Sequence, residues 1–102
     1  MFLFSYVDDY GGQVTIYFTK QKGDADDVLV IPLYLGKWLF TKHRVRGIEF
    51  PGGKGEKGES NEEAAARELM EETGARTDQF HFVADYSVKS DGRSFTKRVF
   101  FL

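Results

Sequence analysis

The chain has 102 residues, of which 41% are hydrophobic and 16% aromatic, so its composition allows one domain, spanning residues 1–102, with a modest core. The formal net charge of -2 at pH 7 argues against a broad nucleic-acid-binding surface, which is normally basic, and leaves only local nucleotide contacts. Because the chain contains no cysteine, disulfides and thiolate metal sites are excluded.

The N-terminus, which reads MFLFSYVDD, predicts neither a signal peptide nor a membrane span. It lacks a basic region, and its apolar run is too short for either kind of segment. We therefore expect no membrane association and a cytoplasmic location.

Two runs in the first third of the chain have the composition of β-strands. Residues 13–18 (QVTIYF) are β-branched and aromatic, and residues 28–35 (VLVIPLYL) read as a buried strand in which Pro32 predicts an edge or a bulge. Gly36 and Lys37 predict a hairpin-like turn into a short strand at residues 38–41. Trp38 lies in that strand with alternating neighbours, so we expect it to pack in the core, with stacking on a nucleobase as the alternative.

The strongest local signals predict one helix. Ser60 followed by Glu63 is a capping box, so the helix should begin near Asn61. Helix-forming residues follow, and Gly74 is placed to end the helix in a left-handed cap. The preceding glycine-rich segment, residues 51–53 (PGG), is suited to bring backbone close to a metal or a phosphate.

The last quarter of the chain predicts two further strands, at residues 80–88 and 94–102, joined by a turn at residues 90–93 (SDGR). The chain closes on the apolar residues 99–102 (VFFL). An exposed strand there would leave unpaired edge groups and apolar side chains in water, so we expect pairing with another chain, which makes a homodimer a candidate assembly. Together the elements predict an α/β (α+β) fold with a mixed sheet.

One side of the predicted helix is acidic. At about 100° per residue, Glu68, Glu71 and Glu72 share roughly a third of the circumference, opposite Leu69 and Met70. Like charges at these spacings oppose helix formation, and the last turn of a helix favours cations over acids. A solvated acidic face is the ordinary explanation, and a divalent cation is the alternative that offsets both costs. Oxygen ligands favour Mg²⁺ or Mn²⁺.

The only histidines offer no second ligand type for such a cation. His43 and His81 lie far apart in the sequence, and neither has a metal-ligand partner at a suitable spacing. We expect both to be surface or packing residues.

The spacing of glycines and charges around the helix resembles the signature of the Nudix hydrolase family. The matching positions are Gly53, Glu59, Arg67, Glu68, Leu69, Glu71, Glu72 and Gly74. Over residues 36–75 the segments GKWL, RG-x-EFPGG and EETGA are also similar to those of YtkD-type nucleoside triphosphatases in the MutT branch of the family.

The resemblance implies a role for each matching residue. Catalytic and metal-binding roles fall to the Gly52 carbonyl and to Glu68, Glu71 and Glu72. Among these, Glu68 would bind metal or help to deprotonate water. Structural support would come from Gly53, Glu59, Arg67 and Gly74, with a salt bridge between Glu59 and Arg67. Two cations, Arg46 and Lys54, are candidates for phosphate binding, although solvation is the commoner role of isolated cations.

The resemblance also implies a Nudix α/β/α sandwich with the Nudix loop-helix-loop. Family members usually continue with further strands and a second large helix, so we expect a truncated form or a fold completed by dimerisation. Many members use another acidic residue beyond the signature. Asp85 and Asp91 are weak substitutes, which we expect at the surface or in a turn.

The implied activity is the Mg²⁺- or Mn²⁺-dependent hydrolysis of a nucleoside diphosphate linked to another group. The leading substrate class is nucleoside triphosphates, including oxidised purine deoxynucleotides, which would give a nucleoside monophosphate and pyrophosphate. Two alternatives stay open: removal of pyrophosphate from the 5′ end of RNA, and a nucleotide-binding regulator that no longer turns over.

Overall fold

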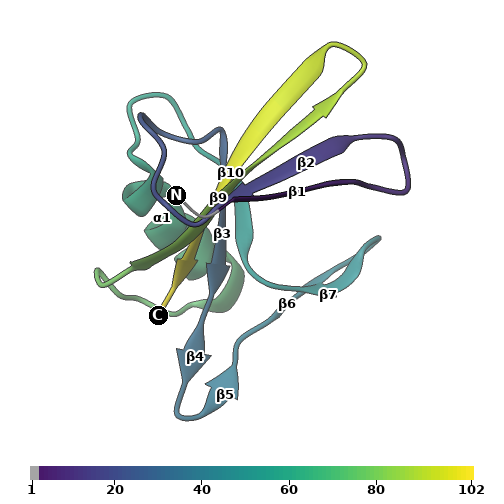
Figure 1. Cartoon of the computed structure of the whole chain (residues 1–102). Helices are drawn as coiled ribbons and strands as arrows, with labels where there is room; N and C mark the ends of the chain where they lie inside the picture. The colour runs from purple at the N-terminus through teal and green to yellow at the C-terminus, as the bar shows by residue number, and fades with distance from the viewer. Residues whose placement is uncertain (1–2) are drawn as a thin grey trace.

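The computed structural model describes residues 3–102, so Met1 and Phe2, which open the apolar N-terminal run, lie outside the described residues. Within that range one helix lies beside a six-stranded sheet, from which two short hairpins project (Figure 1). The elements in chain order are β1 (Leu3–Val7), β2 (Gln13–Tyr17), β3 (Asp27–Ile31), β4 (Leu33–Tyr34), β5 (Lys37–Trp38), β6 (Thr41–His43), β7 (Gly47–Glu49), β8 (Gly52–Lys54), α1 (Asn61–Thr73), β9 (His81–Ser90) and β10 (Arg93–Phe101). None of the helical segments in residues 3–102 has the length and apolar character needed to span a membrane.

The six-stranded sheet is mixed, as the sequence predicts. Its strand order is β1-β2-β9-β10-β3-β8, and only the β10–β3 pair is parallel. The strands predicted at residues 13–18, 80–88 and 94–102 are present with their ends shifted by one or two residues. Strands β1 and β8, which no pattern predicted, extend the sheet at its two edges.

The expectation that the C-terminal run forms an exposed edge is wrong. Strand β10 lies in the interior of the sheet, antiparallel to β9 on one side and parallel to β3 on the other. Val99 is 7% exposed and Phe100 is 3% exposed, so the apolar side chains are buried within the chain itself. This placement removes the reason given above for self-association through the C-terminal strand. The turn predicted at residues 90–93 is confirmed, with Asp91 and Gly92 at φ of 50° and 73°.

Pro32 does not mark an edge strand or a bulge. Strand β3 ends at Ile31, and it lies between β10 and β8. Because proline has no backbone N–H to donate, it ends the strand and separates it from the β4–β5 hairpin. The hairpin turn is one residue earlier than predicted: Leu35 and Gly36 adopt φ of 51° and 76°, and Lys37 already belongs to β5.

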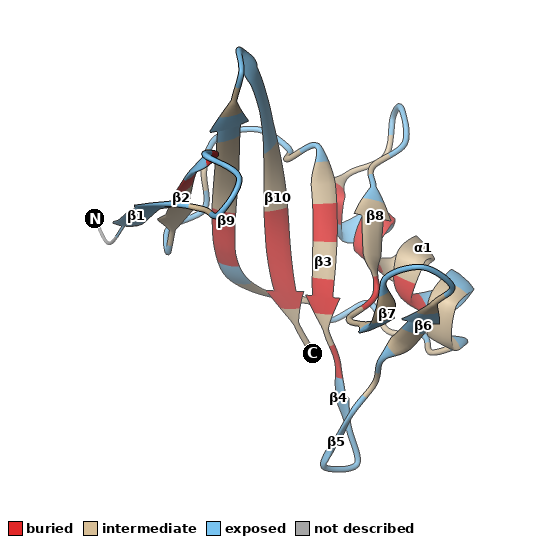
Figure 2. Ribbon diagram, turned by 90° about the vertical axis from the view of Figure 1, so that its right-hand side faces the viewer, coloured by how far each residue is buried: buried red, intermediate tan, exposed pale blue. Residues whose placement is uncertain are grey.

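The core lies between α1 and the centre of the sheet, where Figure 2 shows the buried segments of β3, β10 and the helix. The buried residues of this cluster are Val28, Val30, Ala64, Ala65, Leu69 and Phe100. Burial of a leucine side chain such as Leu69 stabilises the fold by roughly 1.5–3 kcal/mol. Helix α1 packs against β3 and β8 and supplies one helical layer. A second layer, expected for an α/β/α sandwich, is not found within residues 3–102.

Trp38 is not a core residue. It is 50% exposed in the two-residue strand β5 and contacts Phe50 edge-to-face, with ring centroids 6.2 Å apart. Phe50 also stacks on Phe40, at 4.7 Å between centroids. Because β5 belongs to a two-stranded hairpin that projects from the six-stranded sheet, half of the tryptophan surface stays accessible to solvent.

Candidate active site

Helix α1 begins and ends where its capping residues predict. The Ser60 hydroxyl accepts a hydrogen bond from the Glu63 N–H at 3.1 Å, and the Glu63 carboxylate accepts one from the Ser60 N–H at 2.9 Å. Gly74 adopts φ of 78°, and its N–H donates to the Met70 carbonyl at 2.9 Å. Ala64, Ala65 and Leu69 are buried in the core, whereas Met70, predicted on the same apolar side, is 39% exposed. The buried residues set which side of the helix faces the sheet, and the caps set where the helix begins and ends.

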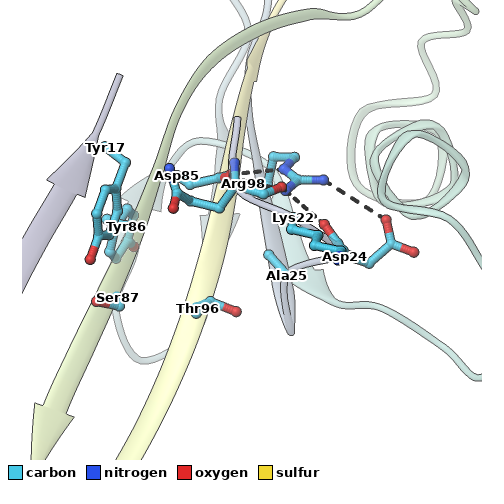
Figure 3. Close-up of a pocket in the computed structure, with 11 residues that line it drawn as sticks. Tyr17, Lys22, Asp24, Ala25, Asp85, Tyr86, Ser87, Thr96 and Arg98 are labelled. Carbon is cyan, nitrogen blue, oxygen red and sulfur yellow. Dashed lines mark hydrogen bonds and ion pairs between the residues drawn. The ribbon is translucent and has the colours of Figure 1, made fainter. Parts of the chain in front are cut away.

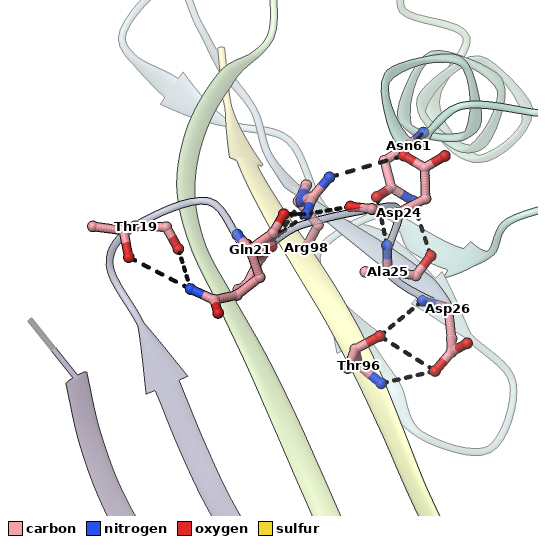
Figure 4. Close-up of polar contacts among 10 residues, drawn as sticks. Thr19, Gln21, Asp24, Ala25, Asp26, Asn61, Thr96 and Arg98 are labelled. Carbon is pink, nitrogen blue, oxygen red and sulfur yellow. Dashed lines mark hydrogen bonds and ion pairs between the residues drawn. The ribbon is translucent and has the colours of Figure 1, made fainter. Parts of the chain in front are cut away.

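Asn61 ties the start of the helix to the loop between β2 and β3 (Figure 4). Its side-chain oxygen accepts from the Ala25 N–H at 2.7 Å, and its side-chain nitrogen donates to the Ala25 carbonyl at 3.0 Å. The residue is 1% exposed, so both polar atoms are satisfied inside the protein. The sequence identified Asn61 only as the first helical residue and did not indicate this anchoring role.

Glu68 lies directly over the glycine-rich segment at residues 51–53, called the glycine loop below, whose last two residues open strand β8. A Cβ atom on Gly53 would be 2.6 Å from one carboxylate oxygen of Glu68, so any other residue here would push this carboxylate out of its present position. Burial raises the pKa of Glu68, the hydrogen bond from Arg67 opposes that rise, and the charges of Glu72 and Glu71 add to it. The loop and the acidic face are therefore in direct contact.

Glu72 is held by the same loop. The Gly52 N–H donates to a carboxylate oxygen of Glu72 at 3.0 Å. A Cβ on Gly52 would come within 2.5 Å of the Val28 carbonyl oxygen, so close packing against β3 also requires glycine here. Glu71, by contrast, is 58% exposed at the outer edge of the face.

Arg67 supplies positive charge to the acidic face and joins it to the loop. Its guanidinium donates two hydrogen bonds to Glu59, at 2.8 and 3.0 Å, and one to the Lys54 carbonyl at 2.9 Å. It also donates to Glu68 at 2.8 Å and approaches Glu71 at 3.5 Å. The hydrogen bond from Arg67 lowers the pKa of Glu59, whereas the Glu59 carboxylate raises the pKa of Arg67. One cation therefore offsets part of the like-charge repulsion along the helix.

The donor set of this region fits a hard divalent cation, because every candidate ligand is an oxygen atom. Within residues 3–102, however, no three acidic or histidine side chains already converge closely enough to hold an ion. Glu68 is engaged by Arg67, and Glu72 by the Gly52 N–H. Each of these bonds uses one carboxylate oxygen, so metal binding would require the carboxylates to move closer together and not to give up their present partners.

The two phosphate-binding candidates have different surroundings. Arg46 donates to Glu49 at 2.8 and 3.0 Å while its side chain is 62% exposed. That hydrogen bond raises the pKa of Arg46, and the charge of Glu72 adds to the rise, so Arg46 is within electrostatic reach of the acidic face. Lys54 is exposed at the end of β8, beside the glycine loop.

The remaining polar candidates lie in turns or at the surface. The His43 ring accepts hydrogen bonds from the N–H groups of Val45 and Arg46, each at 3.1 Å, and so stabilises the tip of the β6–β7 hairpin. His81 is exposed at the start of β9, and Asp91 forms the β9–β10 turn.

The prediction that Asp85 is a surface or turn residue is wrong. Asp85 is 4% exposed and forms a two-bond ion pair, at 2.8 and 2.9 Å, with Arg98, which is 2% exposed (Figure 3). Arg98 also donates to the carbonyls of Gln21 and Gly23, at 3.0 and 2.9 Å, and so holds the β2–β3 loop on the sheet. The two residues lie opposite each other across β9 and β10. Counting outward from the turn at residues 91–92 would have revealed the pair.

Comparison with known proteins identifies the family. The NUDIX domain family matches residues 11–102. A Bacillus subtilis (strain 168) protein provisionally named 8-oxo-dGTP diphosphatase YtkD is 40% identical over 101 residues, which cover 97% of this chain and 64% of the relative. The crystal structure of the Bacillus subtilis pyrophosphohydrolase BsRppH, in a variant with a glutamate replaced by alanine, matches with a TM-score of 0.89 at 39% identity.

That match covers 96% of this chain and 63% of the BsRppH chain, so the present chain spans less than two thirds of either relative. The C. elegans Ap4A hydrolase matches with a TM-score of 0.52 at 17% identity, over 78% of this chain and 67% of that one, which shows similarity of fold alone. The predicted family is thus confirmed over most of the sequence. The chain belongs to the Nudix hydrolase family.

Proposed function

We propose that this protein hydrolyses a pyrophosphate bond of a nucleoside triphosphate, with release of a nucleoside monophosphate and pyrophosphate. The observation that carries the proposal is the contact between the acidic face of α1 and the loop at Gly52 and Gly53, where Glu68 and Glu72 are held against backbone. A packing role does not explain why Glu68, Glu71 and Glu72 gather on one side of the helix. The name of the B. subtilis relative, an 8-oxo-dGTP diphosphatase, supports a nucleoside triphosphate with an oxidised purine as one substrate to test.

In this proposal the residues of the site have two roles, metal binding and activation of water. Glu71, Glu72 and the Gly52 carbonyl would hold Mg²⁺ or Mn²⁺, which when bound supplies charge that neutralises phosphate oxygens and lowers the pKa of a water ligand. Glu68, enclosed between Arg67 and the loop, would bind the metal or accept the proton of the attacking water. The water would then attack a phosphorus atom in line with the leaving group.

Support and phosphate binding fall to neighbouring residues. Glu59 and Arg67 would hold the loop against the helix, with Gly53 admitting the Glu68 carboxylate and Gly74 ending the helix. Arg46 would contact a phosphate only after leaving Glu49, to which it is now bonded. The Lys54 side chain forms no ion pair with another side chain of residues 3–102. Lys54 is therefore more available than Arg46 to contact a phosphate.

A second candidate function is removal of pyrophosphate from the 5′ end of RNA. It uses the same bond cleavage and the same carboxylates. It is favoured by the positive charge of residues 28–48, which contain four lysine or arginine residues and no aspartate or glutamate. The alternative from another functional class is a nucleotide-binding regulator that does not catalyse hydrolysis. It would bind nucleotide without releasing phosphate or pyrophosphate.

The proposal is tested by incubating a panel of nucleoside triphosphates, including 8-oxo-dGTP, with the protein and Mg²⁺ in ¹⁸O-labelled water. We expect nucleoside monophosphate and pyrophosphate, and the mass of each product shows which phosphorus received the labelled oxygen. Release of orthophosphate in place of pyrophosphate would contradict the assigned cleavage. Binding of nucleotide without any product would favour the regulator.

A further inference from the structure

Strand β1 leaves one edge of the six-stranded sheet open. It pairs with β2 on one side, and no strand of residues 3–102 lies on its other side (Figure 2). All five residues of β1 are exposed. The opposite edge of the sheet is β8, which has three residues and packs against α1. The open edge at β1 is therefore the longer of the two, and it is separated from β8 by the other strands of the sheet.

The sequence of β1 does not protect this edge. Exposed edge strands ordinarily carry lysine, proline or a bulge, which prevents pairing with another chain. The strand reads LFSYV, without a charged residue or a proline, and its register with β2 is regular over all five residues. Four of its side chains are apolar or aromatic and 45–68% exposed: Leu3, Phe4, Tyr6 and Val7. Such a strand is a template for pairing with a further strand.

The turn after β1 shows which of its backbone groups point outward. Asp8 and Gly12 continue the register of β1 with β2, and the Asp8 N–H donates to the Gly12 carbonyl at 2.8 Å. In an antiparallel pair, residues that bond across the ladder alternate with residues whose N–H and C=O groups point away. Counting back from Asp8, the even-numbered residues of β1 bond to β2 and the odd-numbered residues face the open edge. These outward residues are Leu3, Ser5 and Val7.

Antiparallel pairing of β1 with β1 of a second copy satisfies all the outward groups in one register. When Ser5 lies opposite Ser5 of the second copy, Leu3 lies opposite Val7, and each of these pairs exchanges two hydrogen bonds. A shift of two residues leaves one outward residue of each copy without a partner. A shift of one residue sets outward groups against residues already bonded to β2. The Ser5-centred register is therefore the one that the backbone favours.

The same register matches side chains on both faces of the sheet. Phe4 lies opposite Tyr6 of the second copy, in the non-hydrogen-bonded position where the Cα atoms are about 4.5 Å apart. Within one chain these two rings are already neighbours, with centroids 5.8 Å apart. On the other face Leu3 and Val7 lie opposite each other. Aromatic and β-branched cross-strand pairs stabilise antiparallel strands, so backbone and side chains favour the same arrangement.

We propose that two copies of this chain associate through β1, antiparallel and centred on Ser5, so that their two six-stranded sheets become one continuous sheet. Because each copy has one β1 edge, the contact is closed and assembly stops at the dimer. Two five-residue strands form a small interface beside the roughly 1,200–2,000 Å² of a stable complex, so the dimer forms only at high protein concentration. The inference is independent of the proposed hydrolase function, because α1 and its glutamates pack beside β8 at the opposite edge.

Sedimentation velocity of the full chain over a range of concentrations tests the association. Ser5→Pro removes the outward N–H of Ser5 and leaves the hydrogen bonds to β2 in place, so it blocks the edge without breaking the ladder. Ser5→Ala is the matched control, since both variants lose the hydroxyl contact with Thr15 at 3.1 Å but only the proline loses the donor. We expect the parent and Ser5→Ala to dimerise at high concentration and Ser5→Pro to stay monomeric with native circular dichroism. A parent that is monomeric at every concentration, or a Ser5→Pro variant that dimerises as the parent does, would overturn the inference.

Two cysteine variants test the register and do not depend on proline. Because the chain has no cysteine, Ser5→Cys introduces one thiol, which lies across the two-fold axis from its copy at about 5.5 Å between Cα atoms, within the range of a disulfide. Val7→Cys places its two thiols four residues apart along the paired strands, about 13 Å, which is beyond that range. We expect mild oxidation to cross-link Ser5→Cys and not Val7→Cys, as read on a non-reducing gel. Equal cross-linking of both variants would contradict the Ser5-centred register, and no cross-linking of Ser5→Cys would contradict the pairing itself.

Discussion

The buried ion pair between Asp85 and Arg98 leads to a strong prediction about stability. Replacing Asp85 with alanine leaves the 2% exposed guanidinium with the Gln21 and Gly23 carbonyls and with Asp24 at 3.9 Å. Removing one partner of a buried pair costs about 3–5 kcal/mol, because the other charge stays buried without compensation. Since a folded domain has a total stability of about 5–15 kcal/mol, Asp85→Ala should retain only part of its folded population under mild denaturing conditions.

The assay is urea unfolding followed by circular dichroism at neutral pH, with the double variant Asp85→Leu/Arg98→Met as the comparison. The double variant removes both charges, so its loss of stability should be smaller than that of Asp85→Ala. A loss below about 1 kcal/mol for Asp85→Ala would refute the reasoning, since exposed ion pairs contribute only that much. A double variant that loses as much as the sum of Asp85→Leu and Arg98→Met alone would show that the two charges do not act as a pair.

Three further predictions concern the loop and the acidic face. Gly53→Ala places a Cβ 2.6 Å from the Glu68 carboxylate, so turnover should fall while circular dichroism stays native; full activity would show that Glu68 can move away freely. Arg67→Ala should lower both melting temperature and rate, and an unchanged melting temperature with no hydrolysis would mean that Arg67 touches substrate. Because Arg67 lowers the pKa of Glu59, this carboxylate stabilises the fold above the ordinary value of 4.5 and loses that contribution as the pH falls through the lowered pKa. The melting temperature of the parent should therefore drop more steeply than that of Glu59→Gln between about pH 5 and pH 3, and parallel curves would contradict the linkage.

The helix could be predicted from the sequence because its determinants are local. The capping box at Ser60, the αL position of Gly74 and the spacing of the glutamates are all set within a few residues of one another. Such signals depend little on the rest of the fold. The ion pair between Arg67 and Glu59, present at 2.8 Å, came only from the resemblance to the family, because Glu59 lies outside the helix and no local pattern fixes where its side chain points.

Features that depend on distant strands were predicted less well. An apolar strand at the end of a sequence and an apolar strand in the middle of a sheet have the same pattern, so β10 was assigned to an edge although β3 pairs with it across a long separation. Asp85 was assigned to the surface because its polarity is visible in the sequence and its partner Arg98 becomes apparent only once the hairpin register is counted. Trp38 was assigned to the core because alternation indicates a half-buried strand and cannot tell what covers it.

The most direct test of the proposed active site is turnover of a nucleoside triphosphate as a function of Mg²⁺ concentration for the parent, Glu71→Gln and Glu72→Gln. Glu62→Gln, an exposed acid in the first turn of the same helix, is the matched control, and melting temperatures are recorded for all four proteins. We predict that both site variants lose most of their turnover while their melting temperatures stay level or rise slightly, since each removes like-charge repulsion from the helix. The control should match the parent. Site variants as active as the parent at saturating Mg²⁺ would contradict the assignment of these glutamates to the metal.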